Sequence, residues 1–269
     1  VYVLRDGEIP RPYFAHVRAP GGVQVTRTHP PVEGKDLTDH ATFHPGIWLA
    51  FGDLSGADFW RLKATVRSEL VGEPEGRPGA GRFAVRNRYE SGGKRLCEET
   101  ARYAIRALPA GYLLLWDSEF RSDAGFSFGD QEEMGLGVRV ATPIAVKTGG
   151  GTITDSAGRK NESGVWGRSA DWCDYRGALG GKPAGVMLMP HPENFRKSWW
   201  HVRDYGLMVA NPFGRNALTK GPKSKVEVGE GETFRLRFGV LVYTGDVDRD
   251  AAYRDYLRIA EAKSRRGKE

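Results

Sequence analysis

Four segments of the chain hold most of the side chains that could carry acid/base or binding chemistry. They are residues 39–46, 126–141, 166–177 and 182–215, and each mixes carboxylates or imidazoles with aromatic rings. A buried polar group without a hydrogen-bond partner costs about 1–3 kcal/mol, so a strand-rich core keeps few of them unless they serve a ligand. Their concentration here indicates a site for a polar small molecule.

The segment 182–215 is the richest of the four. It places imidazole, amide, guanidinium and indole groups between two apolar runs that predict strands. On a strand over Trp199–Arg203, His201 and Arg203 share one face, because side chains alternate. Indole rings beside such polar groups favour a sugar as the ligand. The candidates are His191 and His201 for acid/base catalysis, and Asn194, Arg203 and Tyr205 for substrate binding.

The segment 39–46, DHATFHPG, contains two histidines four residues apart. Pro45 and Gly46 follow at once, which disfavours a helix and favours a loop. In such a loop His40 and His44 can converge on one site, and an unperturbed imidazole titrates near about pH 6.5. We expect both to bind substrate. The alternative is that they only cap turns.

The segment 126–141 has three acids in a tight turn, Asp130, Glu132 and Glu133, followed by Arg139 on a predicted strand. Like charges held close together raise the pKa of one carboxyl group, which makes that group usable as a general acid or base. We expect Asp130 and Glu133 to be catalytic. A solvated acidic turn is the alternative.

The segment 166–177 predicts a strand on which Trp172 and Asp174 share one face. An indole ring can cover the C–H face of a sugar while a carboxylate accepts hydrogen bonds from its hydroxyl groups. We therefore expect both residues to bind substrate. The alternative is a core tryptophan and an aspartate at the sheet edge.

Composition narrows the class of protein. The chain has 269 residues, of which 39% are hydrophobic and 28% charged, and its formal net charge is +6. It contains no nucleic-acid-binding module and no Walker or dinucleotide-binding motif. No apolar run approaches the ~18–20 residues that cross a membrane. We expect a small-molecule carbohydrate as partner, and neither nucleic acid, nor membrane, nor a nucleotide cofactor.

Localisation and redox state are less constrained. The first residues lack the layout of a secretory signal, which favours a cytoplasmic location, although an upstream segment is allowed because the chain does not begin with Met. Cys97 and Cys173 form no paired motif. Two reduced, buried thiols are the favoured interpretation, and one bridge stays open.

Short β-rich runs recur about every 8–12 residues between turn residues, which predicts an all-β fold. We expect one domain over residues 1–269, a large antiparallel β-sandwich with a C-terminal helix at about 246–263 that Asp246 caps. A helical turn is expected at 53–60 and a surface loop at 72–81. The predicted strands are 2–5, 13–17, 23–28, 47–51, 61–70, 82–89, 95–107, 111–121, 136–141, 151–155, 172–177, 184–190, 199–203, 207–211, 225–228 and 233–243.

Several long motifs resemble, in the same order, a bacterial family of unknown function labelled "methane oxygenase PmoA-like". The motifs are HATFHPGIWLAFGDLSGADFW, FGDQEEMGLGVRVA, GVWGRSADWCDYRG and PHPENFRKSWWHVRDYGLMVANPFG. Relatives typically have a lysine in place of Glu132, and a histidine pair where this chain has Thr42, Phe43 and His44 near His40. The residues that match the family pattern are Asp130, Glu133, His191, Asn194, His201, Arg203, Tyr205 and Asn211.

The resemblance implies a setting and a shape. Members lie in gene neighbourhoods with sugar oxidoreductases and sugar isomerases, which implies a role in carbohydrate catabolism. Their fold is similar to the large β-sandwich (supersandwich) of galactose mutarotases. The resemblance thus supports the sugar ligand that the residues indicate.

Together these inferences predict a carbohydrate-active enzyme that works by acid/base chemistry. Glu133 or Asp130 would be the base and His201 or His191 the acid, while Arg203 would stabilise a developing oxyanion. We favour elimination or hydrolysis of an oxidised (keto) glycoside. The alternatives are a sugar mutarotase or epimerase, and a non-catalytic carbohydrate-binding protein.

The main hypothesis needs no metal. A divalent metal ion held by His40, His44 and either His191 or His201 is a further alternative, because imidazole is a common ligand of such ions. Each version requires that segments far apart in the sequence meet around one hollow. The oligomeric state stays open.

Overall fold

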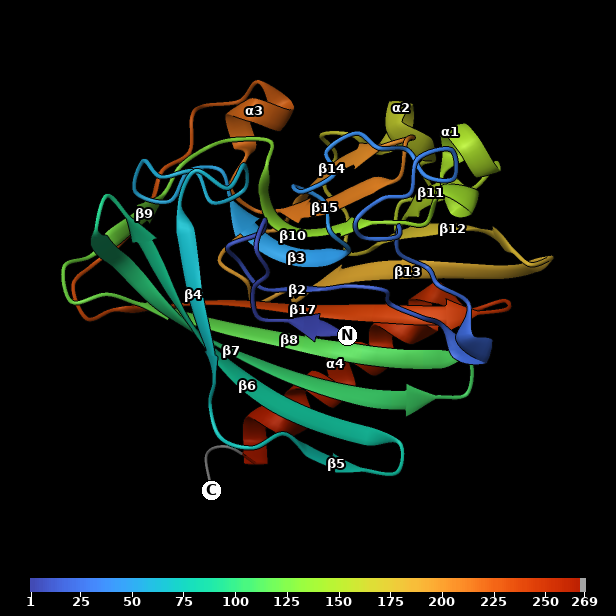
Figure 1. Ribbon diagram of the computed structural model, residues 1–269, viewed down its shortest axis with the longest axis horizontal. Coiled ribbons are helices and arrows are strands. Elements are labelled where there is room, and N and C mark those ends of the chain that lie inside the picture. The colour runs from blue at the N-terminus through green and yellow to red at the C-terminus, as the bar shows by residue number, and fades with distance from the viewer. Residues whose placement is uncertain (267–269) are drawn as a thin grey trace.

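Two large antiparallel sheets face each other in the computed structural model, which describes residues 1–266 and the side chains up to residue 261 (Figure 1). The all-β sandwich expected from the sequence is confirmed, and so is a helix near its C-terminal end. The six-stranded sheet has the order β1 (Tyr2–Val3), β2 (Tyr13–Phe14), β3 (Ile47–Phe51), β10 (Met134–Arg139), β15 (Leu207–Asn211) and β14 (Trp199–Arg203).

The second sheet is larger and is formed mostly by long neighbouring strands. Its order is β11 (Thr152–Asp155), β12 (Cys173–Leu179), β13 (Lys182–Pro190), β17 (Thr233–Thr244), β8 (Gly111–Arg121), β7 (Lys94–Leu108), β6 (Ala80–Ser91) and β4 (Thr65–Leu70), with β5 (Glu75–Arg77) paired to β6. We call it the nine-stranded sheet. A small ribbon joins β9 (Phe126–Phe128) to β16 (Val226–Val228).

Helices are short except for the last. They are α1 (Val146–Gly149), α2 (Asn161–Val165), α3 (Arg215–Thr219) and α4 (Arg249–Arg266), with 3-10 turns at Pro20–Gly22 and Thr142–Ile144. No helix within residues 1–266 is long and apolar enough to span a membrane.

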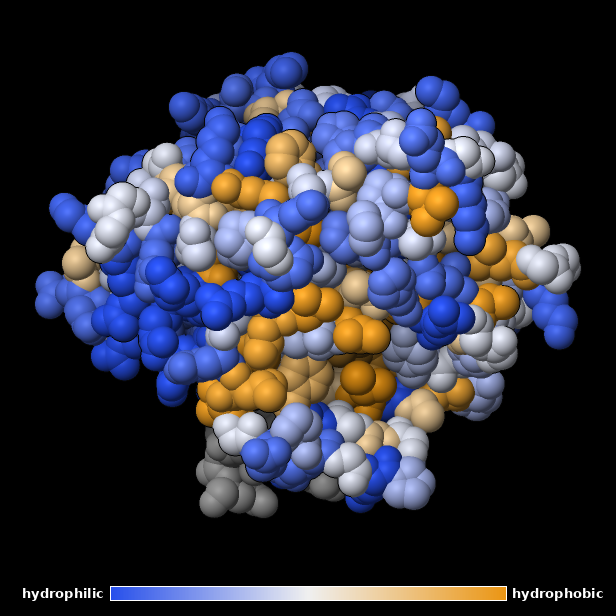
Figure 2. Space-filling view, in the orientation of Figure 1, coloured by the Kyte–Doolittle hydropathy of each residue, from blue (hydrophilic) through white to orange (hydrophobic). Residues whose placement is uncertain are grey.

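The main core lies between the two sheets, where alternate residues of each strand point inward. Trp200 and Val202 of β14 are buried there, against residues such as Tyr175 and Val186 of the nine-stranded sheet. The predicted alternation on β14 is therefore confirmed, with His201 and Arg203 on the outer face. Figure 2 shows hydrophilic residues over most of the upper surface and hydrophobic residues gathered in the lower centre, near β1 and β8.

The outer faces of the two sheets are covered in different ways. Helix α4 packs beneath the nine-stranded sheet, with Tyr256 against Met187, Met189 and Leu241 (Figure 1). Loops cover the outer face of the six-stranded sheet and form a second small core that includes Ile9, Trp48, Trp60, Leu207 and Val209. This loop-covered face is where functional side chains can reach solvent.

Some local predictions were wrong. Residues 23–28 form isolated bridges instead of a strand, and residues 53–60 form turns instead of a helical turn. The expected loop at 72–81 contains β5, which pairs with β6 in a hairpin. Helix α4 is capped by Asp248, whose carboxylate accepts from the backbone N–H of Ala251 at 2.9 Å, while Asp246 pairs with Arg176. Cys97 and Cys173 are both buried and free.

Candidate functional site

Two rows of side chains cross the outer face of the six-stranded sheet. Strand register places Trp48, Gly137, Val209 and His201 in one row. A Cβ atom on Gly137 would lie 2.8 Å from the Trp48 ring, so glycine is what lets the indole lie flat across β10. The second row consists of Arg139, Leu207 and Arg203. His201 ends the first row, while Arg139 and Arg203 stand at the two ends of the second, and all three side chains face the covering loops.

The loop with His40 and His44 is held down by buried arginine. The Arg27 guanidinium donates hydrogen bonds to the backbone carbonyls of Leu37, Asp39, His40 and His44, at 2.6–3.2 Å. Since a guanidinium has a rigid fork of donors, one side chain fixes the whole turn. The backbone of His40 takes a left-handed conformation there, with φ of 49°.

A chain of charge-assisted hydrogen bonds orients the His40 ring. Arg139 binds the Asp39 carboxylate with both terminal nitrogens, at 2.8 and 2.7 Å, and His40 Nδ1 lies 2.8 Å from the same carboxylate. Burial raises the pKa of Asp39, but the hydrogen bonds from Arg139 and His40 outweigh it and leave that pKa well below its usual value. The carboxylate can therefore only accept, so His40 carries its hydrogen on Nδ1 and leaves Nε2 free.

His201 is fixed as the same tautomer by a different partner. Its Nδ1 donates to the backbone carbonyl of Glu132 at 3.0 Å. Burial, followed by the positive charge of Arg203, lowers the pKa of His201 to about 4. His201 is therefore neutral near pH 7, with an unprotonated Nε2 that can accept a proton. The charge of His40 also lowers this pKa. His40 belongs to the loop that covers the same sheet face, where its ring stacks on Tyr205.

The Glu132 carboxylate lies near the free nitrogen of His201 and is itself paired with Arg203. Glu132 Oε2 lies 3.8 Å from His201 Nε2 and 3.2 Å from Arg203 Nη2. Arg203 also pairs with Glu162 at 2.9 Å. A proton taken up by His201 would be stabilised by the Glu132 carboxylate, since opposite charges within about 4–6 Å favour the charged form. The ring of Tyr205 lies over Arg139 at 4.5 Å and stacks on His40 at 6.0 Å.

His44 has a mainly structural environment. Its ring stacks between His40, at 4.8 Å, and Trp48, at 5.1 Å. Burial and the nearby charge of Arg139 lower its pKa well below the usual range. His44 therefore supports the His40 ring as a neutral, planar neighbour.

We call this group the imidazole site. Its members are His40, His44, Asp39, Glu132, Arg139, His201, Arg203 and Tyr205.

A comparison with protein families finds one family whose model matches nearly the whole chain. The model of a family of unknown function, DUF6807, matches residues 1–256. The chain belongs to this family. No curated protein matches it.

In this DUF6807 chain, four of the expected site residues lie far from the imidazole site, on the nine-stranded sheet. The buried Asp174 carboxylate accepts from Tyr243 at 2.8 Å and pairs with Arg249 at 2.5 Å. Trp172 is buried under α4, where its indole nitrogen donates to Asp250 at 2.9 Å. The expectation of one shared hollow is therefore wrong for these residues, because the strand after Trp172 belongs to the other sheet.

His191 and Asn194 follow β13 and stay with the nine-stranded sheet. The Asn194 side chain both donates to and accepts from the backbone of Arg237, at 2.9 and 2.8 Å. The His191 ring packs against Tyr256 of α4. The alternative metal set of His40, His44 and His191 is thus not brought together. No group of three or more potential metal ligands occurs among the residues that the structure describes.

The two acids favoured in the segment 126–141 lie in the right loop but have other partners. The Asp130 carboxylate accepts from the backbone N–H groups of Asn216, Ala217 and Ser224, at 2.7–3.0 Å, and so holds the start of α3. Glu133 pairs with Arg61 at 2.6 Å. The acid beside His201 is the one between them, Glu132.

Sequence reasoning did not assemble the polar chain of Asp39, Glu132, Arg139 and Glu162. Arg139 carries the one signal that was available. It is a charged residue inside an otherwise apolar strand in which all six residues are buried, and a buried charge requires a partner. The sequence does not say which acid supplies it.

Proposed function

We propose that this DUF6807 chain is a carbohydrate-active enzyme that removes a proton next to a carbonyl group of an oxidised (keto) glycoside. The observation that carries the proposal is the pair of imidazoles, His40 and His201, on the loop-covered face of the six-stranded sheet. Each has its Nδ1 hydrogen committed to an acceptor and its Nε2 free. Two such groups with different surroundings can act as acid and base in one reaction.

The roles follow from exposure and charge. His201 is buried and neutral, with a pKa lowered to about 4 by burial and by Arg203, so it acts as the base. The His40 side chain is 45% exposed and its Nδ1 is hydrogen-bonded to the Asp39 carboxylate, so we assign it the role of the acid, which donates from Nε2 a proton taken up from solvent. This differs from the sequence-based hypothesis, in which Glu133 or Asp130 was the base and His201 or His191 the acid.

The proposed reaction is an elimination through an enolate. His201 Nε2 takes the proton from the carbon next to the carbonyl, and the electron pair forms an enolate whose oxygen lies beside Arg203. The enolate collapses, the C–O bond to the aglycone breaks, and His40 gives its proton to the departing oxygen. The products are an unsaturated keto sugar and the free alcohol, and addition of water to the former completes hydrolysis.

Sugar as the substrate class is supported by the surroundings of the two imidazoles. The half-buried Tyr205 ring offers a flat apolar face, and Glu132, Glu162 and Arg203 offer acceptors and donors for hydroxyl groups. The resemblance of the motifs to a family found beside sugar oxidoreductases and isomerases favours the same class. Oxidoreductases of that kind would supply a keto sugar.

The test replaces each histidine by asparagine and follows the turnover of glycosides and 3-keto-glycosides. Asparagine can keep the donor that Nδ1 provides but lacks a group at the position of Nε2. It also tolerates the left-handed backbone of His40. We expect His40→Asn and His201→Asn each to lower turnover by about 10² or more, with aglycone release as the measurement.

The matched control is His16→Asn, because His16 has the same φ of 49° but is not part of the imidazole site. It should keep full activity. Unchanged turnover in both site variants would remove the proposed roles. A wild-type protein that binds these sugars but turns none of them over would be a carbohydrate-binding protein, and interconversion of free sugar anomers would make it a mutarotase.

A further inference from the structure

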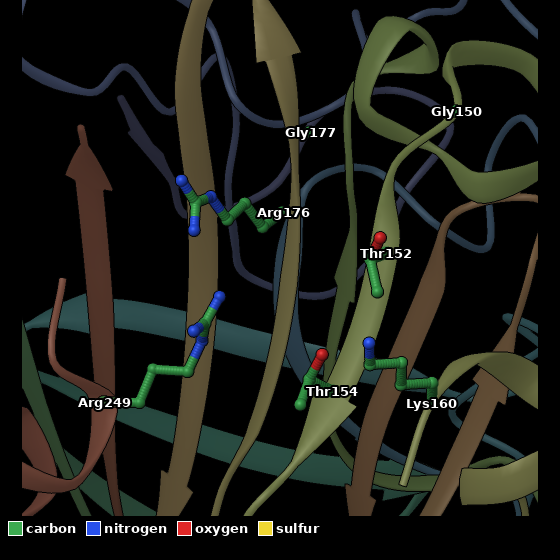
Figure 3. A pocket seen from close by; sticks show the side chains of 7 residues that line it. All are labelled: Gly150, Thr152, Thr154, Lys160, Arg176, Gly177 and Arg249. Atoms are coloured by element: carbon green, nitrogen blue, oxygen red, sulfur yellow. The ribbon is translucent and has the colours of Figure 1, made fainter. Parts of the chain in front are cut away.

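A second polar hollow lies at the β11–β12 edge of the nine-stranded sheet, next to the start of α4. Its volume is about 420 Å³, and its side-chain walls are Thr152, Thr154, Lys160, Arg176 and Arg249 (Figure 3). Pockets that hold small molecules usually have volumes of about 300–1,000 Å³. The hollow is therefore large enough for a monosaccharide-sized ligand.

Strand register explains why these side chains share one face. Thr152 of β11 is the partner of Arg176 on β12, and Thr154 is bridged to Lys160. Antiparallel partners point to the same side of a sheet, so all four project outward together. Arg249 arrives from the start of α4. Figure 3 shows the two guanidinium groups on one side of the hollow, and the Lys160 ammonium and the two threonine side chains on the other.

The charges of the hollow are unevenly satisfied. Arg249 is fixed by the buried carboxylate of Asp174. Arg176 pairs with Asp246, a side chain that is 88% exposed, and solvent screens such exposed pairs so that they contribute little. Within the described part of the chain, Lys160 has no acidic partner within ion-pair distance, and neither threonine hydroxyl is hydrogen-bonded to the protein.

We infer that this hollow binds a small hydroxylated molecule that carries an oxyanion, such as a sugar phosphate or a sugar acid. Lys160 and Arg176 hold the oxyanion, which displaces Asp246 from Arg176. Arg249 adds positive potential from a fixed position, and the threonine hydroxyls contact the neutral part of the ligand. The inference does not rest on the proposed function, because none of these residues belongs to the imidazole site.

Isothermal titration calorimetry in a low-salt buffer without phosphate tests the inference. The probes are glucose 6-phosphate, glucuronate and inorganic phosphate, with glucose as the neutral comparison. We expect saturable binding of a charged sugar, no binding of glucose, and weakening with added NaCl because salt screens exposed charges. Phosphate that binds as well as glucose 6-phosphate would identify the oxyanion alone as the ligand.

Substitutions separate this hollow from non-specific attraction to a basic protein. Lys160→Gln and Arg176→Gln should each lower the affinity at least tenfold. Asp246→Asn should raise it, because a competing carboxylate is removed. Lys182→Gln is the control: Lys182 is exposed at the start of β13 in the same sheet and its loss changes the net charge equally, so affinity should hold.

Two results would overturn the inference. The first is that none of the three anions shows saturable binding at millimolar concentration. The second is an equal loss of affinity in Lys160→Gln and Lys182→Gln. If Arg176→Gln fails to fold, the exposed Lys160 decides the matter alone. Aglycone release at the imidazole site should be unaffected by Lys160→Gln, so failure of one proposal leaves the other standing.

Discussion

At the scale of single residues, the lowered pKa of His201 affects both its proposed role as a base and the stability of the fold at acidic pH. Burial and Arg203 lower the pKa of His201 to about 4 in the folded protein, whereas an unfolded histidine titrates near about 6.5. As the pH falls from 6.5 toward 4, His201 becomes protonated in the unfolded chain but stays mostly neutral in the folded chain. The contribution of His201 to the free energy of unfolding is therefore highest above pH 6.5 and falls as the pH drops.

Urea unfolding at pH 7 and at pH 5 measures this effect. His201 should account for about 2 kcal/mol of the stability lost by the wild type between these two values. In His201→Asn that contribution is absent, so the stability gap between wild type and variant should narrow at pH 5. A gap of constant size would mean that His201 has the same pKa in the folded and unfolded protein.

A second residue-scale prediction concerns Glu99, a fully buried carboxyl group between the sheets. It is hydrogen-bonded to Ser118, Asn87 and Tyr89. Burial raises its pKa despite these hydrogen bonds, so the stability it contributes is present at low pH and is lost as the pH rises through that raised pKa. An amide would keep the same partners without titrating.

We expect Glu99→Gln to fold and to be at least as stable as the wild type at pH 8, with a flatter dependence of stability on pH. Glu99→Leu is the comparison, because it leaves buried donors without an acceptor, at a cost of about 1–3 kcal/mol for each. Thermal unfolding of the three proteins across pH 5–8 is the measurement. Equal destabilisation of both variants would show that the carboxylate itself is required.

At the scale of elements, alternation of apolar and polar residues was enough to predict most strands. Strand β14 is the best case, because Trp200 and Val202 face the core and His201 and Arg203 face outward. Strand β5 was missed because its residues lie in a run rich in glycine and proline. What the pattern could not give is which sheet a strand joins, since pairing depends on contacts between residues far apart. Trp172 and Asp174 were misplaced for this reason.

Asp174 is buried in the structure, and its contacts predict a large contribution to stability. It ties β12 to Tyr243 of β17 and to Arg249 of α4, and removal of one partner from a buried ion pair costs about 3–5 kcal/mol. Asp174→Ala should lower the free energy of unfolding by that amount in urea titrations. Asp171→Ala, in an exposed pair with Lys197, should change it by less than about 1 kcal/mol. A purely ligand-binding Asp174 would leave stability unchanged.

At the scale of the whole molecule, the sandwich has two outer faces with different covers. The site expected from the sequence is divided between them: His40, His44, His201, Arg203 and Tyr205 lie on the loop-covered face. Residues capable of acid/base or binding chemistry could be recognised by type. Which outer face each one lies on depends on the sheet that its strand joins. Neighbouring acids in one turn show the same limit, since Asp130 serves α3 while Glu132, two positions later, faces His201.

The ion pair between Arg139 and Asp39 spans 100 residues of sequence, and the contact of His201 with the backbone of Glu132 spans 69. Long-range contacts of this kind form late, because each requires closure of a large loop. During refolding, the β6–β7 and β7–β8 hairpins can assemble early, whereas the two imidazoles meet only when the beginning of the chain docks on strands from its last third. Recovery of activity should therefore lag behind recovery of the far-ultraviolet circular dichroism signal.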